Sequence, residues 1–207
     1  MIAHIFFGGI SLVIGLFILL IKKGDKRHKS IGNIFFYAMI LTVFSAFIMT
    51  YLRPNYFLFI VGVFTAYMLL SGKRYLKKKK ITDVKHIDWL LTFIMLLFGA
   101  AFIAFGFYLV FKSNFFGIVF LVFGVISLVF VYQDYLNFKG KAGVKNYWLV
   151  THFQRMIGSY IATITAFLVV NNTFLPGVIA WLLPTAILVP LIIFWSRKYE
   201  IKHKKLK

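Results

Sequence analysis

Residues 1–29 read MIAHIFFGGISLVIGLFILLIKKGDKRHK, an uncharged run over Met1–Ile21 followed at once by a cluster of lysine and arginine. An α-helix rises about 1.5 Å per residue, so roughly 20 apolar residues cross the hydrocarbon layer of a bilayer. We therefore expect Met1–Ile21 to form a membrane-spanning helix. No basic segment precedes this run and no Ala-x-Ala motif follows it, so we expect the helix to be retained and not cleaved as a signal peptide.

The rest of the chain repeats this pattern of an apolar run followed by a polar connection. A long apolar stretch near the C-terminus is interrupted at residues 171–177 by turn-forming residues, which divide it into two spans. The sequence thus predicts an all-α, polytopic integral membrane protein with seven transmembrane helices, over residues 4–22, 31–51, 56–72, 89–111, 115–134, 148–170 and 175–195. We expect one seven-helix bundle over residues 1–196, followed by a basic cytoplasmic tail over residues 197–207.

The composition agrees with a membrane protein and excludes several other classes. Of the 207 residues, 61% are hydrophobic and 14% are charged, and there is no cysteine. Soluble domains are about half apolar and about a quarter charged. The composition therefore excludes a soluble enzyme, and the missing cysteine excludes a disulfide scaffold, an iron–sulfur protein and cysteine-type haem attachment.

The net charge of +19 indicates membrane orientation, because the cations are strongly segregated. Of the 24 lysines and arginines, 21 lie in the C-terminal segment or in the connections between spans 1 and 2, spans 3 and 4, and spans 5 and 6. The other three are Arg53, Lys112 and Arg155. By the positive-inside rule the N-terminus lies outside and the C-terminus is cytoplasmic, in a multi-pass protein of the bacterial cytoplasmic membrane. No nucleic-acid partner is needed to explain the charge.

The run Lys77–Lys80 is a candidate site for anionic lipids, at about 1 kcal/mol per cation near the surface. The oligomeric state stays open.

Several known classes of membrane protein also have seven spans in this orientation, but this chain lacks the residues on which their functions depend. Retinal proteins need a lysine in the last span, and none lies between Phe174 and Trp195. Sugar transporters with two three-helix repeats rely on matching prolines, whereas Pro184 and Pro190 are both in the last span. Ion-coupled transporters and proton pumps usually need a carboxylate at mid-membrane, and all five acidic residues lie at or beyond the predicted cytoplasmic boundary.

The sixth span carries the most informative polar residues. His152, Arg155 and Ser159 have the 3-4 spacing of one helix face. An arginine below the membrane interface costs a few kcal/mol or more unless it is paired or hydrated, and is by default a functional candidate. Asp134 and Asp88 are its available partners. A structural Arg–Asp pair that locks helices together and a ligand-binding role both fit this pattern.

Further polar residues lie toward the same end of other spans. Tyr67, Ser71 and Arg74 share one face of the third span. Because the outer halves of the spans are mostly apolar, these residues predict a cytoplasm-facing polar pocket, with an ordinary interfacial polar belt as the alternative. The pocket candidates are His28, Tyr67, Ser71, Arg74, Asp134, His152, Arg155 and Ser159.

Histidines add a candidate metal or haem site and a packing site. His28 and His152 are expected at similar depth, and two imidazoles can bind a divalent metal or haem, although no tight ligand motif is present. On the outer side, His4 shares a face with Gly8, Ser11 and Gly15. Such a small-residue stripe lets another helix approach closely, so we expect His4 to be a packed, hydrogen-bonded residue.

Three segments together resemble a known family. They include Lys22-Lys23-Gly24-x-x-x-His28, the run Tyr67–Arg74, and His152-x-x-Arg155-Met156. The chain is similar along nearly its whole length to a bacterial family of predicted multi-span membrane proteins whose function is not established. The resemblance implies that His28, Arg74, His152 and Arg155 are recurrent polar positions, but it supplies no reaction.

Three functional hypotheses follow from these residues. The first is a membrane-embedded binding or redox module, with His28 and His152 as ligands and Arg155 holding an anionic group. The second is a hydrolase or transferase acting on a lipid-derived phosphate substrate, with His152 as base, although only Ser71 and Ser159 are candidate nucleophiles. The third is a non-catalytic small-solute carrier or structural partner, which the apolar outer half of the bundle disfavours.

Overall fold

A computed structural model describes residues 1–201 of the chain, apart from the side chain of Phe57. Within this part the chain forms seven α-helices: α1 (Ile2–Leu20), α2 (Lys26–Leu52), α3 (Tyr56–Tyr75), α4 (His86–Phe111), α5 (Gly117–Phe138), α6 (Tyr147–Asn171) and α7 (Gly177–Tyr199). A 3-10 turn, η1 (Ile81–Asp83), lies between α3 and α4. Polar side chains begin two of the helices, since Asp25 accepts from the amide of His28 at 2.7 Å and Asn55 from that of Leu58 at 3.1 Å.

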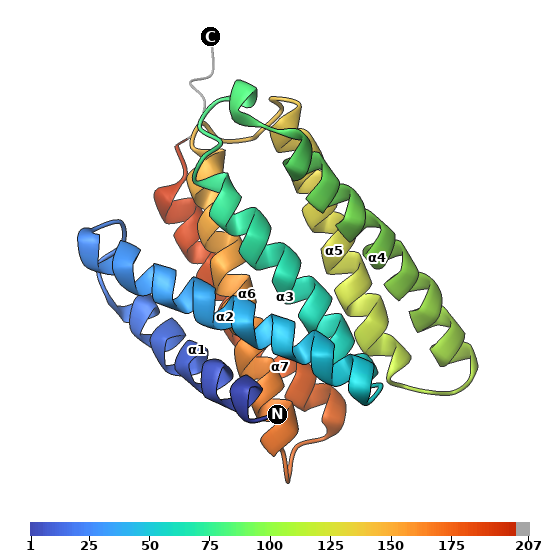
Figure 1. The fold of residues 1–207 in the computed structure, drawn as a ribbon. Coiled ribbons are helices and arrows are strands. Elements are labelled where there is room, and N and C mark those ends of the chain that lie inside the picture. Colours follow the sequence, from blue (N-terminus) through green and yellow to red (C-terminus); the bar gives the residue numbers. More distant parts are fainter. Residues whose placement is uncertain (202–207) are drawn as a thin grey trace.

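The helices pack as hairpins and longer-range pairs around α3 (Figure 1). The main interfaces join α1 with α2, α4 with α5, α3 with α6, and α6 with α7. Figure 1 shows that the α3–α4 and α5–α6 connections lie at the top of the view, and the α1–α2 connection at the left. The N-terminus and the α4–α5 and α6–α7 connections lie at the bottom. We call the part of the bundle that carries connections 21–25, 76–85 and 139–146 the basic end.

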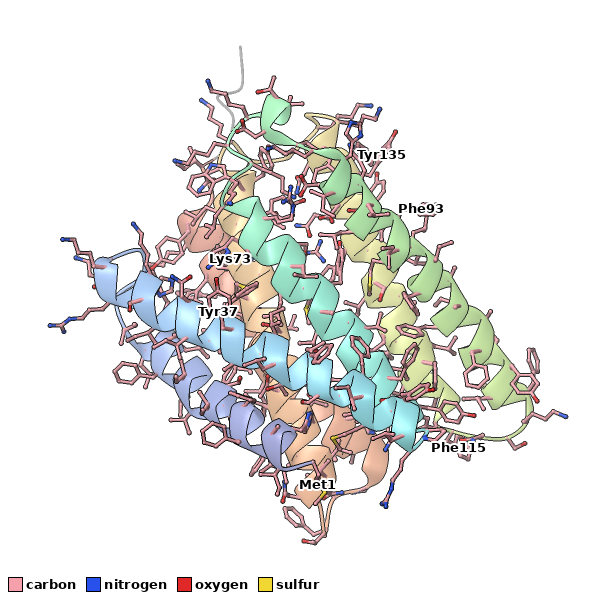
Figure 2. The ribbon with its side chains drawn as sticks, viewed as in Figure 1. Met1, Tyr37, Lys73, Phe93, Phe115 and Tyr135 are labelled. Atoms are coloured by element: carbon pink, nitrogen blue, oxygen red, sulfur yellow. The ribbon has the colours of Figure 1, made fainter. Side chains whose placement is uncertain are left out.

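At least six helices of the described residues, α1, α2, α4, α5, α6 and α7, are long and apolar enough to cross a membrane, which makes the protein a polytopic helical membrane protein. The span expected at α3 stays a prediction. Helix α3 is the most enclosed helix, and its buried residues include Ile60, Met68 and Leu69, each fully shielded from solvent. A helix surrounded by protein can carry polar residues that a lipid-facing helix cannot. In contrast, α4 directs side chains such as Phe93 outward (Figure 2).

The helix ends differ from the expected spans by a few residues. Helix α5 continues to Phe138 and α7 to Tyr199, so the first three residues of the expected tail are helical. Residues 202–207 of that tail lie outside the described residues. These extensions matter for α5, because they place Asn137 on the same helix as Asp134.

Small residues bring helices close together in two places. On the α4–α5 interface, an ideal Cβ on Gly117 would lie 2.5 Å from the backbone oxygen of Gly106, which is closer than any real contact. On α1, a Cβ on Gly15 would collide with the ring of Tyr160 at 2.2 Å. His4 lies 3.1 Å, through Nδ1, from the Thr42 carbonyl. The expectation of close packing with a hydrogen-bonded histidine on this face of α1 is confirmed.

Substituting Gly117 by alanine should destabilise the bundle, because the added methyl group meets backbone that cannot rotate away. Overpacking of this kind costs about 1–3 kcal/mol, and we expect a lower unfolding temperature in detergent. Gly9→Ala is the matched control, since Gly9 is an exposed helical glycine with nothing within 4 Å of an added Cβ. Equal unfolding temperatures for the two variants would contradict the close approach of α4 and α5.

Candidate functional site

Asp134 on α5 is the centre of a buried hydrogen-bond network at the basic end. Its Oδ1 lies 2.7 Å from the hydroxyl of Tyr75 and 3.0 Å from Nη2 of Arg155. Its Oδ2 lies 2.5 Å from the hydroxyl of Tyr67 and 2.9 Å from that of Thr92. A carboxylate offers about four lone-pair positions to donors. The acceptor capacity of Asp134 is therefore filled by groups from α3, α4 and α6.

Arg155 on α6 is only partly satisfied by the same network. Its side chain is fully buried, and Nη2 donates to Asp134, to the carbonyl of Phe130 at 3.0 Å and to Oε1 of Gln133 at 3.4 Å. The guanidinium carbon lies 3.8 Å from the centroid of the Phe130 ring. Within residues 1–201, Nε and Nη1 have no hydrogen-bond partner. These two nitrogens carry three of the five N–H bonds of an arginine, and each buried unsatisfied donor costs about 1–3 kcal/mol.

A second ionic cluster surrounds Asp88 at the start of α4. Arg74 contacts both carboxylate oxygens, with Nε 2.6 Å from Oδ1 and Nη2 2.9 Å from Oδ2. The ammonium of Lys78 lies 2.8 Å from Oδ1 of Asp88 and 4.0 Å from the centroid of the Tyr75 ring. Burial lowers the pKa of Lys78, and the neighbouring Asp88 carboxylate opposes that shift. The bidentate arginine and the cation–π contact are both strong forms of their interactions when shielded from water.

Tyr75 joins the two clusters, since its hydroxyl contacts Asp134 while its ring faces Lys78. Thr92 joins them as well, because its hydroxyl lies 3.0 Å from the backbone oxygen of Asp88 and 2.9 Å from Asp134. Three cations, Arg74, Lys78 and Arg155, thus share two carboxylates. The connected network carries a surplus of one positive charge.

A cavity of about 150 Å³ lies next to this network, between the end of α5, connection 139–146 and the start of α6. Its polar lining comes from Gln133, Asn137, Lys141, Tyr147 and Thr151. The side-chain nitrogen of Asn137 donates to the Tyr75 hydroxyl at 3.1 Å, and Gln133 accepts from Arg155. The hydroxyl of Tyr147 is buried without a partner in the described residues. An engineered cavity of similar volume holds a molecule the size of benzene.

The eight residues predicted for a pocket do not form one lining. Tyr67, Asp134 and Arg155 meet directly, and Asp134 is the partner that Arg155 takes from the two the sequence offered. Arg74 belongs to the neighbouring Asp88 cluster. Ser71 is buried on the face of α3 that carries Tyr67, and its hydroxyl has no partner within residues 1–201. Ser159 is fully buried and donates to the Met156 carbonyl of its own helix at 2.7 Å.

The two histidines take separate roles. Nδ1 of His152 lies 2.8 Å from the carbonyl oxygen of Gly72. Because a carbonyl only accepts, this nitrogen carries the proton and the lone pair is on Nε2. Nδ1 of His28 is buried without a partner in the described part of the chain. Residues 1–201 contain no group of three or more His, Cys, Asp or Glu arranged to hold a metal ion. Metal or haem binding by His28 and His152 stays a prediction.

Several residues of the site were missed by sequence reasoning. Tyr75 and Asn137 carried a usable signal, because Tyr75 lies eight residues after Tyr67 and Asn137 lies three after Asp134, in each case on one helix face. Lys78 had been grouped with the surface run Lys77–Lys80. The structure buries Lys78 against Asp88 and leaves the other three lysines exposed, which removes it from any lipid-facing surface.

Replacing Asp134 by leucine should destabilise the protein more than replacing Arg155 by leucine. Without Asp134, the buried Arg155 loses its counter-charge and the hydroxyls of Tyr67 and Tyr75 lose their acceptor, whereas without Arg155 the carboxylate keeps its hydroxyl donors. Removing one partner of a buried pair costs about 3–5 kcal/mol, while replacing both can be nearly neutral. We therefore expect the double variant to unfold at a higher temperature in detergent than Asp134→Leu alone. Equal shifts for the two single variants would exclude this arrangement.

Comparison with known proteins identifies a family without supplying a function. The model of a family described as predicted membrane protein (DUF2306) matches residues 1–116, which is more than half of the chain, and the chain belongs to that family. No curated protein and no solved structure matches it. The matched residues include Tyr67, Arg74 and Asp88, whereas Asp134 and Arg155 follow the matched region.

Proposed function

We propose that this member of the DUF2306 family is a seven-span protein of the bacterial cytoplasmic membrane that binds a small anionic group at Arg155 from the cytoplasmic side. The N-terminus lies outside and the C-terminus in the cytoplasm. The cation-rich connections at the basic end support this orientation, because the α2–α3 and α4–α5 connections carry only Arg53 and Lys112. The enclosed position of α3 supports a seventh span that neighbouring helices shield from lipid.

The orientation predicts which connections an impermeant reagent can reach. The chain contains no cysteine, so single cysteines can be introduced without a background reaction. Phe115→Cys, in the exposed α4–α5 connection, should react with a membrane-impermeant maleimide in intact cells. Lys79→Cys, in the exposed α3–α4 connection, should react only after the cells are permeabilised. The reverse pattern would overturn the proposed topology.

One observation carries the proposed binding function, namely the unequal satisfaction of the Arg155–Asp134 pair. Arg155 contacts Asp134 through Nη2 alone, which leaves Nε and Nη1 without a partner among residues 1–201. The free N–H groups on Nε and Nη1 can each donate a hydrogen bond to an oxygen of a carboxylate or a phosphate. The surplus positive charge of the network favours an anion over a neutral ligand.

The cavity supports a compact ligand that approaches from the basic end and reaches Arg155 past Gln133, because Arg155 itself is not among the lining residues. Its wall includes Gln133, which already contacts Arg155, and Lys141 lies on its lining. The unpartnered hydroxyl of Tyr147 is available to a bound group. A carboxylate or phosphate group matches both the volume and these donors. We infer no reaction, because among residues 1–201 neither candidate nucleophile, Ser71 or Ser159, is hydrogen-bonded to a histidine or a carboxylate that could act as its base.

Inorganic phosphate and acetate are suitable probes for this site. A ligand that binds only the folded state raises the unfolding free energy by RT ln(1 + [L]/Kd), about 2.7 kcal/mol at 100 times Kd. We expect one of the two anions to raise the unfolding temperature of the purified protein, relative to chloride at the same ionic strength. Arg155→Lys keeps the charge but loses the unpartnered Nε and Nη1 donors, and should abolish the effect.

Tyr147→Phe is a less disruptive variant than Arg155→Lys for the same measurement. It removes a hydroxyl that has no protein partner among residues 1–201, so the unliganded protein should unfold at an unchanged temperature. The anion-induced shift should become smaller. No shift in the unmodified protein, or an equal shift in Arg155→Lys, would contradict the proposal.

A second proposal, a divalent metal or haem bound through His28 and His152, has one observation in its favour. Metal-ligating histidines commonly donate their other ring nitrogen to a backbone carbonyl, as His152 does to Gly72. The purified protein would then show a Soret band or stoichiometric metal that His152→Ala removes and His86→Ala retains. A colourless and metal-free preparation would exclude this alternative.

A further inference from the structure

A groove between α1 and α2 has the shape of a binding site for one amphiphilic molecule. It encloses about 480 Å³, and Phe7 and Ile10 of α1 line one side. The α2 side is lined by Ser30, Asn33, Ile34, Tyr37, Ala38 and Leu41. Tyr37 projects from α2 near the middle of this stretch (Figure 2).

The two ends of the groove differ in polarity. The antiparallel register of α1 and α2 is set by contacts such as that between Gly8 and Thr42, so Phe7 lies near Leu41 and makes one end apolar. The other end is formed by Ser30 and Asn33, close to the start of α2. The groove is therefore apolar where it enters the bundle and polar where it approaches the basic end.

Cations surround the polar end. Lys26 and Lys29 continue the helix face of Ser30 and Asn33 at spacings of three and four residues, and both are exposed. The ammonium of Lys73 on α3 donates to the side-chain oxygen of Asn33. In the part of the chain that the structure describes, none of these three lysines forms an ion pair with a carboxylate.

We propose that this groove binds one anionic phospholipid, with its phosphate at the Ser30–Asn33–Lys73 end and an acyl chain along Ile34, Ala38 and Leu41. The twelve residues from Ser30 to Leu41 span about 16 Å of helix, close to half of the roughly 30 Å hydrocarbon core. One acyl chain of one leaflet therefore fits the apolar length while its headgroup reaches the lysines.

The charge distribution selects this occupant over others. A second copy of the chain would bring its own excess of positive charge to a cationic mouth, and a free phosphate would leave the apolar wall exposed. In the run of lysines after α3, Lys78 is already paired with Asp88. The groove is formed by helices other than those that supply Asp134 and Arg155, so this proposal stands independently of the anion site.

Lipid binding to the full-length protein in detergent tests the proposal. Phosphatidylglycerol and phosphatidylcholine with identical acyl chains are compared by native mass spectrometry. We expect roughly a tenfold preference for phosphatidylglycerol, because each cation near a headgroup contributes to anionic-lipid binding. Glycerol 3-phosphate, which has no acyl chain, should not compete. Equal binding of both lipids, or full competition by glycerol 3-phosphate, would overturn the groove as a lipid site.

Two matched triple variants locate the site. Lys26→Gln/Lys29→Gln/Lys73→Gln should abolish the preference for phosphatidylglycerol, whereas Lys77→Gln/Lys79→Gln/Lys80→Gln removes the same charge from exposed positions elsewhere and should retain it. Leu41→Trp, which fills the apolar end, should weaken binding of both lipids. Loss of the preference in the second triple variant and not in the first would place the lipid on the run after α3 and overturn the proposal.

Discussion

A buried arginine in a membrane protein must find its counter-charge inside the protein, and the Arg155–Asp134 contact meets that constraint here. Asp134 also accepts from Tyr67, Tyr75 and Thr92, so one carboxylate ties α5 to α3, α4 and α6. Gly72 makes this geometry accessible, because a Cβ at that position would lie 2.9 Å from Cβ of Arg155. The close approach of α3 to α6 and the shared carboxylate therefore depend on each other.

The hydrogen bonding of the Arg155–Asp134 pair distinguishes a purely structural role from a binding role. A structural ion pair inside a membrane protein gains most when both partners are fully hydrogen-bonded, because an unmet donor costs as much as the contact contributes. Asp134 meets that condition and Arg155 does not. The groups of this pair that lack a partner are all hydrogen-bond donors of Arg155. The charged residues of the two connected clusters together carry one net positive charge. Both facts favour an acceptor with negative charge at the unpartnered nitrogens of Arg155.

The spans could be predicted from sequence because lipid requires each helix to satisfy its own backbone over a fixed length. Apolar runs and charge boundaries report that requirement locally, which is why predicted and observed helix ends differ by only a few residues. The network around Asp134 depends instead on how helices rotate and approach one another. Spacing placed Tyr67 and Arg155 on suitable faces, but the approach of Thr92 from α4 is a property of the packed bundle. The sequence indicates a resemblance to the family along nearly the whole chain. The family match covers residues 1–116 and ends before Asp134.

The run Lys77–Lys80 shows why identical residues in one run can be buried or exposed. Lys78 is buried because Asp88, at the first turn of α4, provides a carboxylate, and the rings of Tyr75 and Phe138 provide a shielded site for its ammonium. Its neighbours have no such partner and remain exposed. The same reasoning applies to Lys73, whose ammonium is held by the neutral side chain of Asn33 and so keeps its charge uncompensated. A basic run in a membrane protein therefore marks orientation as a whole, while the nearest carboxylate decides which of its cations can still attract an anion.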